Sequence, residues 1–495
     1  MVIAMAKQFR VFRVRPLTKQ LGDVIPVPAS VRPVPATSFT ILPGTGVSTV
    51  PEASGVAAYL ASELAKTVDG PIPIGPGGAI VLELDPSLAA EAYTLTAGES
   101  SVTLRGGTPQ GLFWGVQTLL QLAPEVPGGV IEDEPRYEYR GAMLDLARHF
   151  FTAAEIKAHV DLLVQFKINH LHLHLTDDQG WRLEIPGWPR LTEISGGEGT
   201  GVDGAGPGFL TLAEYADVVA YAADRFVTVV PEIDMPGHVN AVHYAYPSLT
   251  ADGQPVRQRI DAEVGYSSLV AGKEETYAFV EDVIRAVADA TPGPYLHIGG
   301  DECHSTPAED YRAFLARVLP LPGKYGKRAI GWHEIAAVEL PETAVVQYWR
   351  IEAADENTAR AATEGRRIIM APADRTYLDM KYDPESPLGL DWAGHVDVRR
   401  SYDWDPADRL PGVPEEALLG VEAPLWSETL RSVADIQYLT FPRLPAIAEV
   451  AWSPRSVREW ESFRTRLAAF GPRWEAAGVN FHRAPEIPWI TAEPA

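Results

Sequence analysis

The chain has 495 residues, of which 46% are hydrophobic and 22% charged, a composition typical of a globular protein large enough for two domains. The formal net charge of −24 excludes nucleic acid and anionic membranes as expected partners, because both would be repelled. No apolar run approaches the ~20 residues that cross a bilayer. A single cysteine allows no intrachain disulfide.

The N-terminal stretch MVIAMAKQFRVFRVRPL lacks the apolar region and cleavage site of a secretory signal. This predicts a cytoplasmic protein, or a secreted one if the N-terminus is incomplete. We leave 1–23 unassigned and predict a small α+β domain over 24–135. Its predicted elements are a proline-rich extended segment at 24–35, a helix at 55–68, a strand at 79–84, a hairpin at 91–106 and a helix at 110–123. The Pro-Gly stretch at 124–129 is expected to end this domain.

The pattern changes over 136–495, where short apolar strands alternate with amphipathic helices such as 152–167 and 211–225. This is the pattern of an α/β protein of the (β/α)₈ TIM barrel type. The strands are predicted at 141–147, 168–175, 227–234, 295–300, 329–334, 344–349, 367–372 and 418–426. The link 335–343 is too short for a full helix, so one barrel helix should be reduced.

Polar and aromatic residues accompany the ends of these strands, and barrel enzymes hold their active sites at the C-terminal ends. The residues are Arg140 before the first strand, Asp177 and Asp178 after the second, Glu232, Asp234 and His238 at the third, Asp301 and Glu302 at the fourth, Trp332 and Glu334 at the fifth, Trp349 at the sixth, and Trp426 and Glu428 at the eighth. Such a concentration predicts a functional site there.

Carboxylates combined with tryptophans are typical of carbohydrate sites, because indole covers the apolar face of a sugar ring while Asp, Glu and Arg bind its hydroxyls. Trp332, Trp349, Trp392 and Trp426 all fall at predicted strand ends or on the long loops there. A tryptophan can equally be a core residue, but four at one rim favour a site.

Asp301 and Glu302 are adjacent in the chain. Most glycosidases need two carboxyl groups that face each other across the scissile bond, and adjacent residues are poorly suited to that arrangement. Neighbouring Cα atoms are only ~3.8 Å apart, and in extended chain the two side chains diverge. One carboxyl can protonate the leaving oxygen while the other reaches another part of the same sugar. The pair therefore predicts an acid and a helper, with the nucleophile supplied from elsewhere.

Several longer stretches resemble the family 20 glycoside hydrolases, the β-N-acetylhexosaminidases. They are RGAMLDLARHF (140–150), HLHLTDDQGWR (172–182), PEIDMPGH (231–238), HIGGDECHST (297–306), WHE (332–334), TYLDMKY (376–382), WAGHV (392–396) and APLWSE (423–428), together with SVTLRGGTPQGLFWGVQTL near the end of the small domain. The resemblance spans the whole barrel in order. It implies a retaining, exo-acting enzyme that removes terminal β-linked GlcNAc or GalNAc.

In that family the substrate's own acetamido carbonyl attacks the anomeric carbon and gives an oxazolinium intermediate. The resemblance then implies that Glu302 is the acid and base, that Asp301 orients the acetamide, and that Tyr377 hydrogen-bonds its oxygen. The substrate-binding candidates are Arg140, Asp177, Asp234, His238, Trp332, Trp349, Asp379, Trp392, Trp426 and Glu428. Among them, Arg140 and Glu428 would hold sugar hydroxyls, and Asp234 and His238 would support the acid. No cofactor or metal is implied, and the partner is an oligosaccharide or glycoconjugate ending in an N-acetylhexosamine.

Cys303 departs from the family pattern, which has a small apolar residue such as Ala after the acidic pair. A buried, inert thiol is expected, although a reactive one stays open. Two other functions also stay open. His170, His172 and His174 alternate onto one face of a strand, as metal ligands of an amidohydrolase might, or as fillers of the barrel interior. A carbohydrate-binding protein without activity is the other alternative, but it would be expected to lose the acid.

Overall fold

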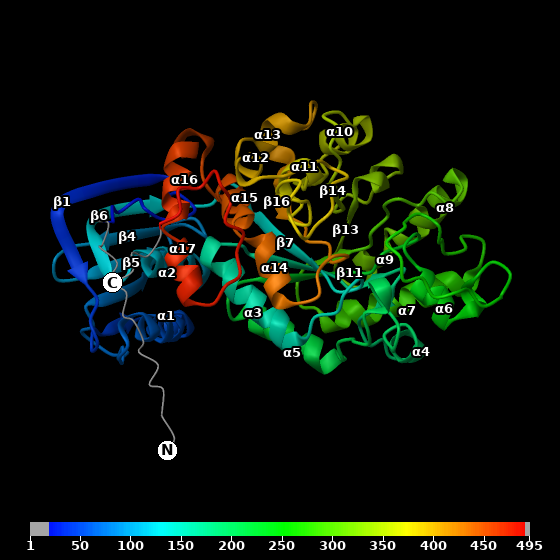
Figure 1. Cartoon of the computed structure of the whole chain (residues 1–495), viewed down its shortest axis with the longest axis horizontal. Helices are drawn as coiled ribbons and strands as arrows, with labels where there is room; N and C mark the ends of the chain where they lie inside the picture. Colours follow the sequence, from blue (N-terminus) through cyan, green and yellow to red (C-terminus); the bar gives the residue numbers. More distant parts are fainter. Residues whose placement is uncertain (1–18, 491–495) are drawn as a thin grey trace, which may run out of the picture.

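The computed structural model describes residues 19–490, so most of the unassigned segment 1–23 lies outside the described residues. Figure 1 shows an N-terminal domain in blue and cyan beside a larger barrel. Two C-terminal helices, α16 (Trp460–Ala468) and α17 (Gly471–Ala476), return to the N-terminal domain, where Arg466 donates to the carbonyl of Val24 at 2.7 Å. Within the described residues, no helix has the length and apolar character needed to cross a membrane.

The N-terminal domain is a six-stranded mixed sheet in the order β1-β6-β4-β5-β3-β2, with two helices packed on it. Its elements are β1 (Ser30–Thr40), β2 (Val47–Thr49), α1 (Ser54–Val68), β3 (Ile80–Leu84), β4 (Tyr93–Ala97), β5 (Val102–Gly106), α2 (Pro109–Leu122) and β6 (Glu125–Asp133). The predicted hairpin is β4 and β5, and the predicted helices are α1 and α2. Helix α2 begins after Thr108, whose hydroxyl caps Gly111 N, with proline at the first turn.

The Pro-Gly stretch at 124–129 does not end the domain as predicted, because it forms the first half of strand β6. Its pairing with edge strand β1 shifts register where Pro127 and Gly129 face Ser38 and Pro33. A Cβ on Gly129 would lie 2.4 Å from the carbonyl oxygen of Arg32. Glycine and proline here mark a bulge and a close backbone approach within a strand pair. The predicted boundary between residues 135 and 136 falls in the linker from β6 to β7.

The eight predicted barrel strands are present and close into one parallel barrel, β7-β8-β11-β12-β13-β14-β15-β16. Their bounds are β7 (Tyr139–Asp145), β8 (His170–His174), β11 (Thr228–Glu232), β12 (Tyr295–His297), β13 (Arg328–Trp332), β14 (Val345–Tyr348), β15 (Arg367–Met370) and β16 (Leu418–Ala423). A short hairpin of β9 (Thr176–Asp177) and β10 (Gly180–Trp181) follows β8. The strand prediction is confirmed, and the ends differ by a few residues.

Helices lie between these strands and after the last of them (Figure 1). They are α3 (Ala153–Leu163), α4 (Arg190–Glu193), α5 (Leu212–Ala223), α6 (Asn240–Ala245), α7 (Glu274–Ala290), α8 (Ala308–Val318), α9 (Leu321–Lys324), α10 (Glu356–Thr363), α11 (Ala373–Thr376), α12 (Val398–Tyr402), α13 (Pro406–Arg409), α14 (Val433–Thr440) and α15 (Arg443–Trp452). Thr152 and Thr211 each open a helix with a capping box, completed by Glu155 and Glu214. Only a 3₁₀ turn (His333–Ala337) follows β13, so the predicted reduced helix is confirmed.

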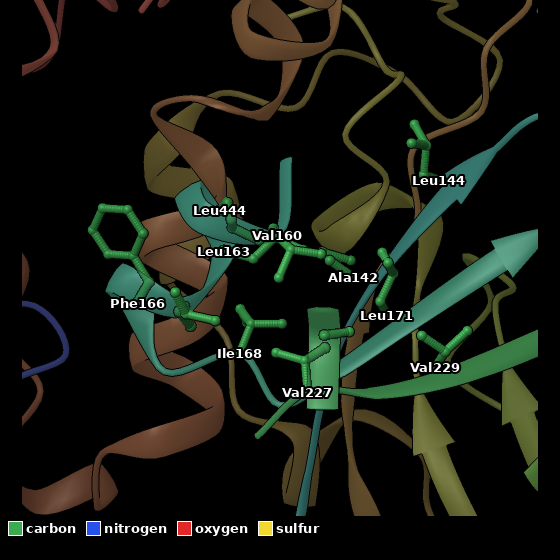
Figure 2. Packing of buried hydrophobic residues seen from close by; sticks show 14 of the residues in the cluster. Ala142, Leu144, Val160, Leu163, Phe166, Ile168, Leu171, Val227, Val229 and Leu444 are labelled. Atoms are coloured by element: carbon green, nitrogen blue, oxygen red, sulfur yellow. The ribbon is translucent and has the colours of Figure 1, made fainter. Parts of the chain in front are cut away.

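The outer faces of the first barrel strands pack against neighbouring helices. Figure 2 shows Ala142 and Leu171, from two adjacent strands, near Val160 of α3, with Val229 of the next strand and Leu444 of α15 in the same cluster. All five side chains are buried, and together they hold the helical layer on the barrel.

The barrel interior has two layers of different character. Toward the N-terminal ends of the strands lies an apolar layer, made of Tyr139, Val230, Tyr295, Ile330, Val345, Ile369 and Leu419. One inward position further along lies a buried polar layer, made of His172, Glu232, His297, Trp332, Gln347 and Glu422. The polar layer therefore sits directly beneath the C-terminal rim.

Candidate active site

The predicted site residues, with the exception of Arg140, gather at the C-terminal ends of the barrel strands. Asp177 follows β8, Asp234 and His238 follow β11, Asp301 and Glu302 follow β12, Trp332 ends β13, Trp349 follows β14, Tyr377, Asp379 and Trp392 follow β15, and Trp426 and Glu428 follow β16. Most are buried, whereas Trp392 is 49% exposed at the outer edge.

The acidic pair sits on a tight turn that the preceding glycines make possible. Gly299 and Gly300 have φ of 69° and 101°, and Glu302 itself has φ of 47°. A Cβ on Gly299 would lie 1.7 Å from Asp234 Oδ1, and Gly300 N donates to that oxygen at 3.2 Å. The left-handed conformation at Glu302 removes the divergence expected of extended chain. The two carboxylates therefore point into the same space.

Both carboxylates approach one imidazole nitrogen. His238 Nε2 lies 3.6 Å from Asp301 Oδ2 and 3.7 Å from Glu302 Oε2. On its other side, His238 Nδ1 is 3.1 Å from Asp177 Oδ1, and Asp177 Oδ2 is 2.8 Å from Arg148 Nη2. Burial opposes a charge on His238, but Asp177, with Asp234 and Asp301, outweighs it and raises the pKa of the imidazole well above its ordinary value. His238 Nε2 thus faces both carboxylates at distances longer than a hydrogen bond, and the raised pKa favours a positive charge there.

Burial is also the largest influence on the acidic pair itself. It raises the pKa of Glu302, while the positive charge of His238 acts in the opposite direction. Burial and the negative charge of Asp234 raise the pKa of Asp301 well above that of an ordinary aspartate. The pKa of Asp234 is itself raised to about 7, mainly by burial. Glu302 is therefore suited to carry a proton, as a general acid must.

Aromatic side chains form a wall around these carboxylates. Ring centroids lie 5.8 Å apart for Trp332 and Trp426, 5.8 Å for Tyr377 and Trp392, and 5.9 Å for Trp349 and Trp392. Two indoles are fixed by carboxylates, since Trp332 Nε1 donates to Glu232 at 2.9 Å and Trp349 Nε1 donates to Glu334 at 3.2 Å. The wall supplies the apolar, oriented surface that a sugar ring requires.

Several buried carboxylate oxygens at the site have no hydrogen-bond partner within the described residues. Among the described residues, both oxygens of Asp379, Glu428 Oε2 and Asp301 Oδ1 are buried and unpartnered. Burial and the charge of Glu428 raise the pKa of Asp379 well above its ordinary value. Buried acceptors are normally satisfied, so these oxygens are suited to accept hydrogen bonds from a ligand's hydroxyl or amide groups.

The predicted sugar-binding role of Arg140 is wrong. Arg140 lies near the N-terminal end of β7, where its guanidinium donates to Lys167 O at 2.8 Å, Tyr137 O at 2.9 Å and Glu91 at 2.5 Å. It also lies over Trp452, with Cζ 4.8 Å from the ring centroid. Arg140 is the second residue of its strand, so it lies at the opposite end of the barrel from the site.

Arg148, which the prediction missed, occupies the rim instead. It follows the C-terminal end of β7, and its guanidinium lies over Trp426 at 4.9 Å and bonds Asp145 and Asp177 at 3.3 and 2.8 Å. The signal was present in the stretch LARHF, directly after the first strand. Asp178 and Glu334, noted at strand ends, also lie at the rim.

Cys303 lies beside the acidic pair with its thiol against the backbone. Its Sγ is 3.1 Å from the carbonyl oxygen of Asp301, and a Cβ on Gly237 would come within 3.1 Å of the sulfur. Burial raises the pKa of the Cys303 thiol far above its ordinary value. These features support the inert thiol, because the thiolate is the reactive form.

The alternating histidines of β8 fill the barrel interior. His172 bridges Glu422 and Glu232 at 2.9 and 3.0 Å, and His174 bridges Glu232 and Asp177 at 2.5 and 2.8 Å. Burial opposes their charge, but these carboxylates raise the pKa of His172 to about 9 and raise that of His174 well above its ordinary value. With both ring nitrogens protonated and directed at carboxylates, neither histidine offers a lone pair to a metal.

Family models match nearly the whole described chain. The model of the glycosyl hydrolase family 20 catalytic domain matches residues 137–455, and that of the family's domain 2 matches residues 22–134. The chain belongs to glycoside hydrolase family 20. The resemblance carried by the sequence motifs is thereby confirmed.

Relatives of known structure and function agree with this assignment. A β-N-acetylhexosaminidase of Cellulomonas fimi is 39% identical over 94% of this chain and 97% of its own length. A mutant Streptomyces plicatus β-hexosaminidase, solved with its product GlcNAc, is 48% identical, covers 96% of this chain and 99% of its own, and has a TM-score of 0.93. An exo-β-N-acetylglucosaminidase of Vibrio harveyi, also solved with N-acetylglucosamine, has a TM-score of 0.85 at 30% identity and covers 98% of this chain and 82% of its own.

Proposed function

We propose that this protein is an exo-acting, retaining β-N-acetylhexosaminidase that removes terminal β-linked N-acetylhexosamine by substrate-assisted catalysis. One observation carries the proposal. Asp301 and Glu302 lie side by side at His238 Nε2, at 3.6 and 3.7 Å, instead of facing each other across a bond. Such a pair provides an acid and a helper but no opposed nucleophile, which is the arrangement that substrate-assisted family 20 chemistry needs.

In the first step, the acetamido carbonyl oxygen of the sugar attacks the anomeric carbon while Glu302 donates its proton to the leaving oxygen. The glycosidic bond breaks, and the sugar becomes a cyclic oxazolinium ion. Burial, which raises the pKa of Glu302, favours the protonated acid before the step. Afterwards the carboxylate of Glu302 takes a proton from water, which opens the ring at the anomeric carbon with net retention.

Asp301 and Tyr377 act on the acetamide. Asp301 accepts a hydrogen bond from the acetamido N–H and balances the positive charge that develops on that nitrogen. Burial and Asp234 raise the pKa of Asp301, whereas the positive charge that develops on the nitrogen attracts its carboxylate oxygen, so stabilisation is greatest in the transition state. Tyr377 donates its hydroxyl to the acetamido oxygen, and burial keeps the phenol protonated by raising its pKa well above 10.

The rest of the rim binds the sugar ring. Trp332, Trp349 and Trp426 cover its apolar faces, with Trp392 at the exposed edge. The unpartnered oxygens of Asp379 and Glu428, with Arg148 replacing Arg140 in the predicted role, bind the ring hydroxyls. A site that uses most hydroxyls of one ring accepts the terminal residue of a glycan, which supports exo action.

Turnover of paired aryl β-GlcNAc and β-GalNAc substrates tests this function, with the first-formed anomer followed by ¹H NMR. We expect release of the aryl group from at least one of them, with the β-anomer appearing first and rates unchanged by a chelator. Binding without turnover would establish a carbohydrate-binding protein. Activity lost in the chelator, or an α-anomer appearing first, would overturn the mechanism.

A further inference from the structure

Glu232 lies in the polar layer beneath the site, at the end of β11 and fully buried. Oε1 accepts the indole N–H of Trp332 at 2.9 Å, and Oε2 accepts from His172 at 3.0 Å and His174 at 2.5 Å. His297 Nδ1 lies 3.0 Å from Oε1. One carboxylate therefore contacts both the aromatic wall and the histidines under the acidic pair.

From Glu232 a hydrogen-bonded chain runs through His174 and Asp177 to His238, the histidine beside the reacting groups. His174 Nε2 is 2.8 Å from Asp177 Oδ2, and Asp177 Oδ1 is 3.1 Å from His238 Nδ1. His238 Nε2 then faces the two catalytic carboxylates. Every side chain from Glu232 to His238 is at least 98% buried, so no flexible surface group interrupts the chain.

We propose that Glu232 is a positioning residue that ties the orientation of Trp332 to the His174–Asp177–His238 chain, and through it to Glu302. The inference rests on the proposed function. Glu232 touches no substrate, but it sets the distance between the indole under the sugar and the acid beside the glycosidic bond. Hydrogen bonds from Trp332, His172 and His174 leave the two oxygens of Glu232 little freedom to move. Misplacement of a positioned group by about 1 Å can cost ~10²-fold in rate.

Trp349 provides a matched control, because it lines the same wall but donates its indole N–H to Glu334. Trp332→Phe and Trp349→Phe each keep an aromatic ring and remove one N–H donor. His174→Gln keeps an amide donor near the Nε2 position that faces Asp177 and removes the Nδ1 contact to Glu232. Two double-mutant cycles, each pairing one tryptophan variant with His174→Gln, measure kcat/KM for aryl β-GlcNAc.

In the Trp332 cycle, we expect the loss of kcat/KM in the double variant to differ from the product of the two single-variant losses by a factor of roughly 3 or more. In the Trp349 cycle, the two values should agree within about 2-fold. Multiplicative behaviour in both cycles, or equal deviation in both, would overturn the proposal. If His174→Gln does not fold, His238→Gln takes its place with the same expected outcomes. Each variant's fold is checked by circular dichroism and thermal unfolding.

A second readout separates positioning from simple structural support. Glu422 is as buried as Glu232 and bonds the other nitrogen of His172 at 2.9 Å, but it contacts neither Trp332 nor His174. Glu232→Gln should displace a limb of the kcat/KM–pH profile by about one unit, because a charge beside His174 is lost. Glu422→Gln should keep the wild-type profile. Identical profiles for both variants would contradict the proposal, while wild-type turnover of aryl β-GlcNAc separately tests the proposed function.

Discussion

The two ends of the barrel carry similar types of buried residue, but they differ in how many of the polar atoms have hydrogen-bond partners. At the N-terminal end, the base cluster of Glu91, Asp133, Arg140, Lys167 and Trp452 is fully paired within the described residues. At the C-terminal rim, buried oxygens of Asp234, Asp301, Asp379 and Glu428 have no partner there. Charge, burial and tryptophan are common to both ends, so only unmet hydrogen-bonding capacity distinguishes a ligand site from a structural cluster.

Asp133 shows what complete pairing means at the base. Its carboxylate accepts from Tyr93 OH at 2.7 Å, Lys167 Nζ at 2.9 Å and Trp452 Nε1 at 3.0 Å, and Ala29 N at 3.0 Å. These contacts join the N-terminal domain to the barrel. The base cluster should therefore affect stability without affecting turnover, and the rim should do the reverse.

Glu302→Gln, at the rim, should produce the largest effect, a loss of activity without a loss of stability. Loss of the acid is expected to lower kcat/KM by ~10²–10⁴-fold for substrates with a poor leaving group, and by less for activated aryl leaving groups, which need little protonation. The side chain of Glu302 is 29% exposed, so the free energy of unfolding should barely change. Equal losses on both types of substrate would remove the acid role from Glu302.

Asp133→Asn should produce the converse result at the base. It leaves Lys167 buried without a charged partner, which typically costs ~3–5 kcal/mol of unfolding free energy. Chemical denaturation measures the loss, and kcat/KM of the folded enzyme should stay near the wild-type value. A stable but inactive variant would show that the base cluster serves catalysis.

Stability should also depend on pH through His172 in the polar layer. Burial opposes its charge, but Glu422 and Glu232 raise its pKa from 6.5 to about 9. The folded state therefore binds this proton more tightly, so the stabilisation is complete below pH 6.5 and is lost as pH rises toward 9. Denaturation at both pH values should show lower stability at the higher one, by at most roughly 3 kcal/mol. A rise in stability across this interval would contradict the assignment.

Replacing each arginine by lysine sharpens the comparison between the two ends. Arg148→Lys should lower kcat/KM by about 10- to 100-fold, because lysine cannot hold Asp145, Asp177 and the face of Trp426 together. Arg140→Lys should lower the unfolding free energy by about 1–3 kcal/mol and leave kcat/KM within about 2-fold. The opposite pattern would restore Arg140 to the site.

Cys303→Ala should produce the smallest effect. The thiol is partly buried against the backbone, and its raised pKa favours the protonated form. Its removal should therefore leave most of the activity, as should treatment with a thiol reagent. A folded but nearly inactive variant would show that the thiol takes part in the reaction.

The arginines also show what could be predicted from the sequence. The alternation of apolar strands and helices predicted eight barrel strands. Strand direction predicted that residues that follow a strand lie at the C-terminal rim. Arg140 is the second residue of β7 and Arg148 follows the end of that strand, so strand direction separates the two arginines. The prediction followed the conspicuous motif RGAMLD and assigned the wrong arginine.

Other features depended on contacts between distant segments. The positive φ of Glu302 turns adjacent carboxylates toward one histidine, and the backbone just before it, at Gly300, donates to Asp234, which follows another strand. Glu232 accepts a hydrogen bond from Trp332, which lies 100 positions further along the chain. No local sequence pattern could reveal that contact. The Pro-Gly stretch at 124–129 became a strand because β1 and β4 lie on either side of it.

The most direct test of the central claim compares kcat/KM for aryl β-GlcNAc with that for the matching aryl β-glucoside, with inhibition by a GlcNAc-thiazoline measured alongside. The glucoside keeps the ring contacts but carries no acetamide, so it loses a nucleophile whose effective molarity can reach ~10⁵–10⁸ M. We predict a preference of at least roughly 10³-fold for the N-acetylglucosaminide, and tight binding of the thiazoline as a mimic of the cyclic intermediate. Comparable rates on the two substrates, or a glycosyl ester trapped on any carboxylate of the enzyme, would contradict substrate-assisted catalysis.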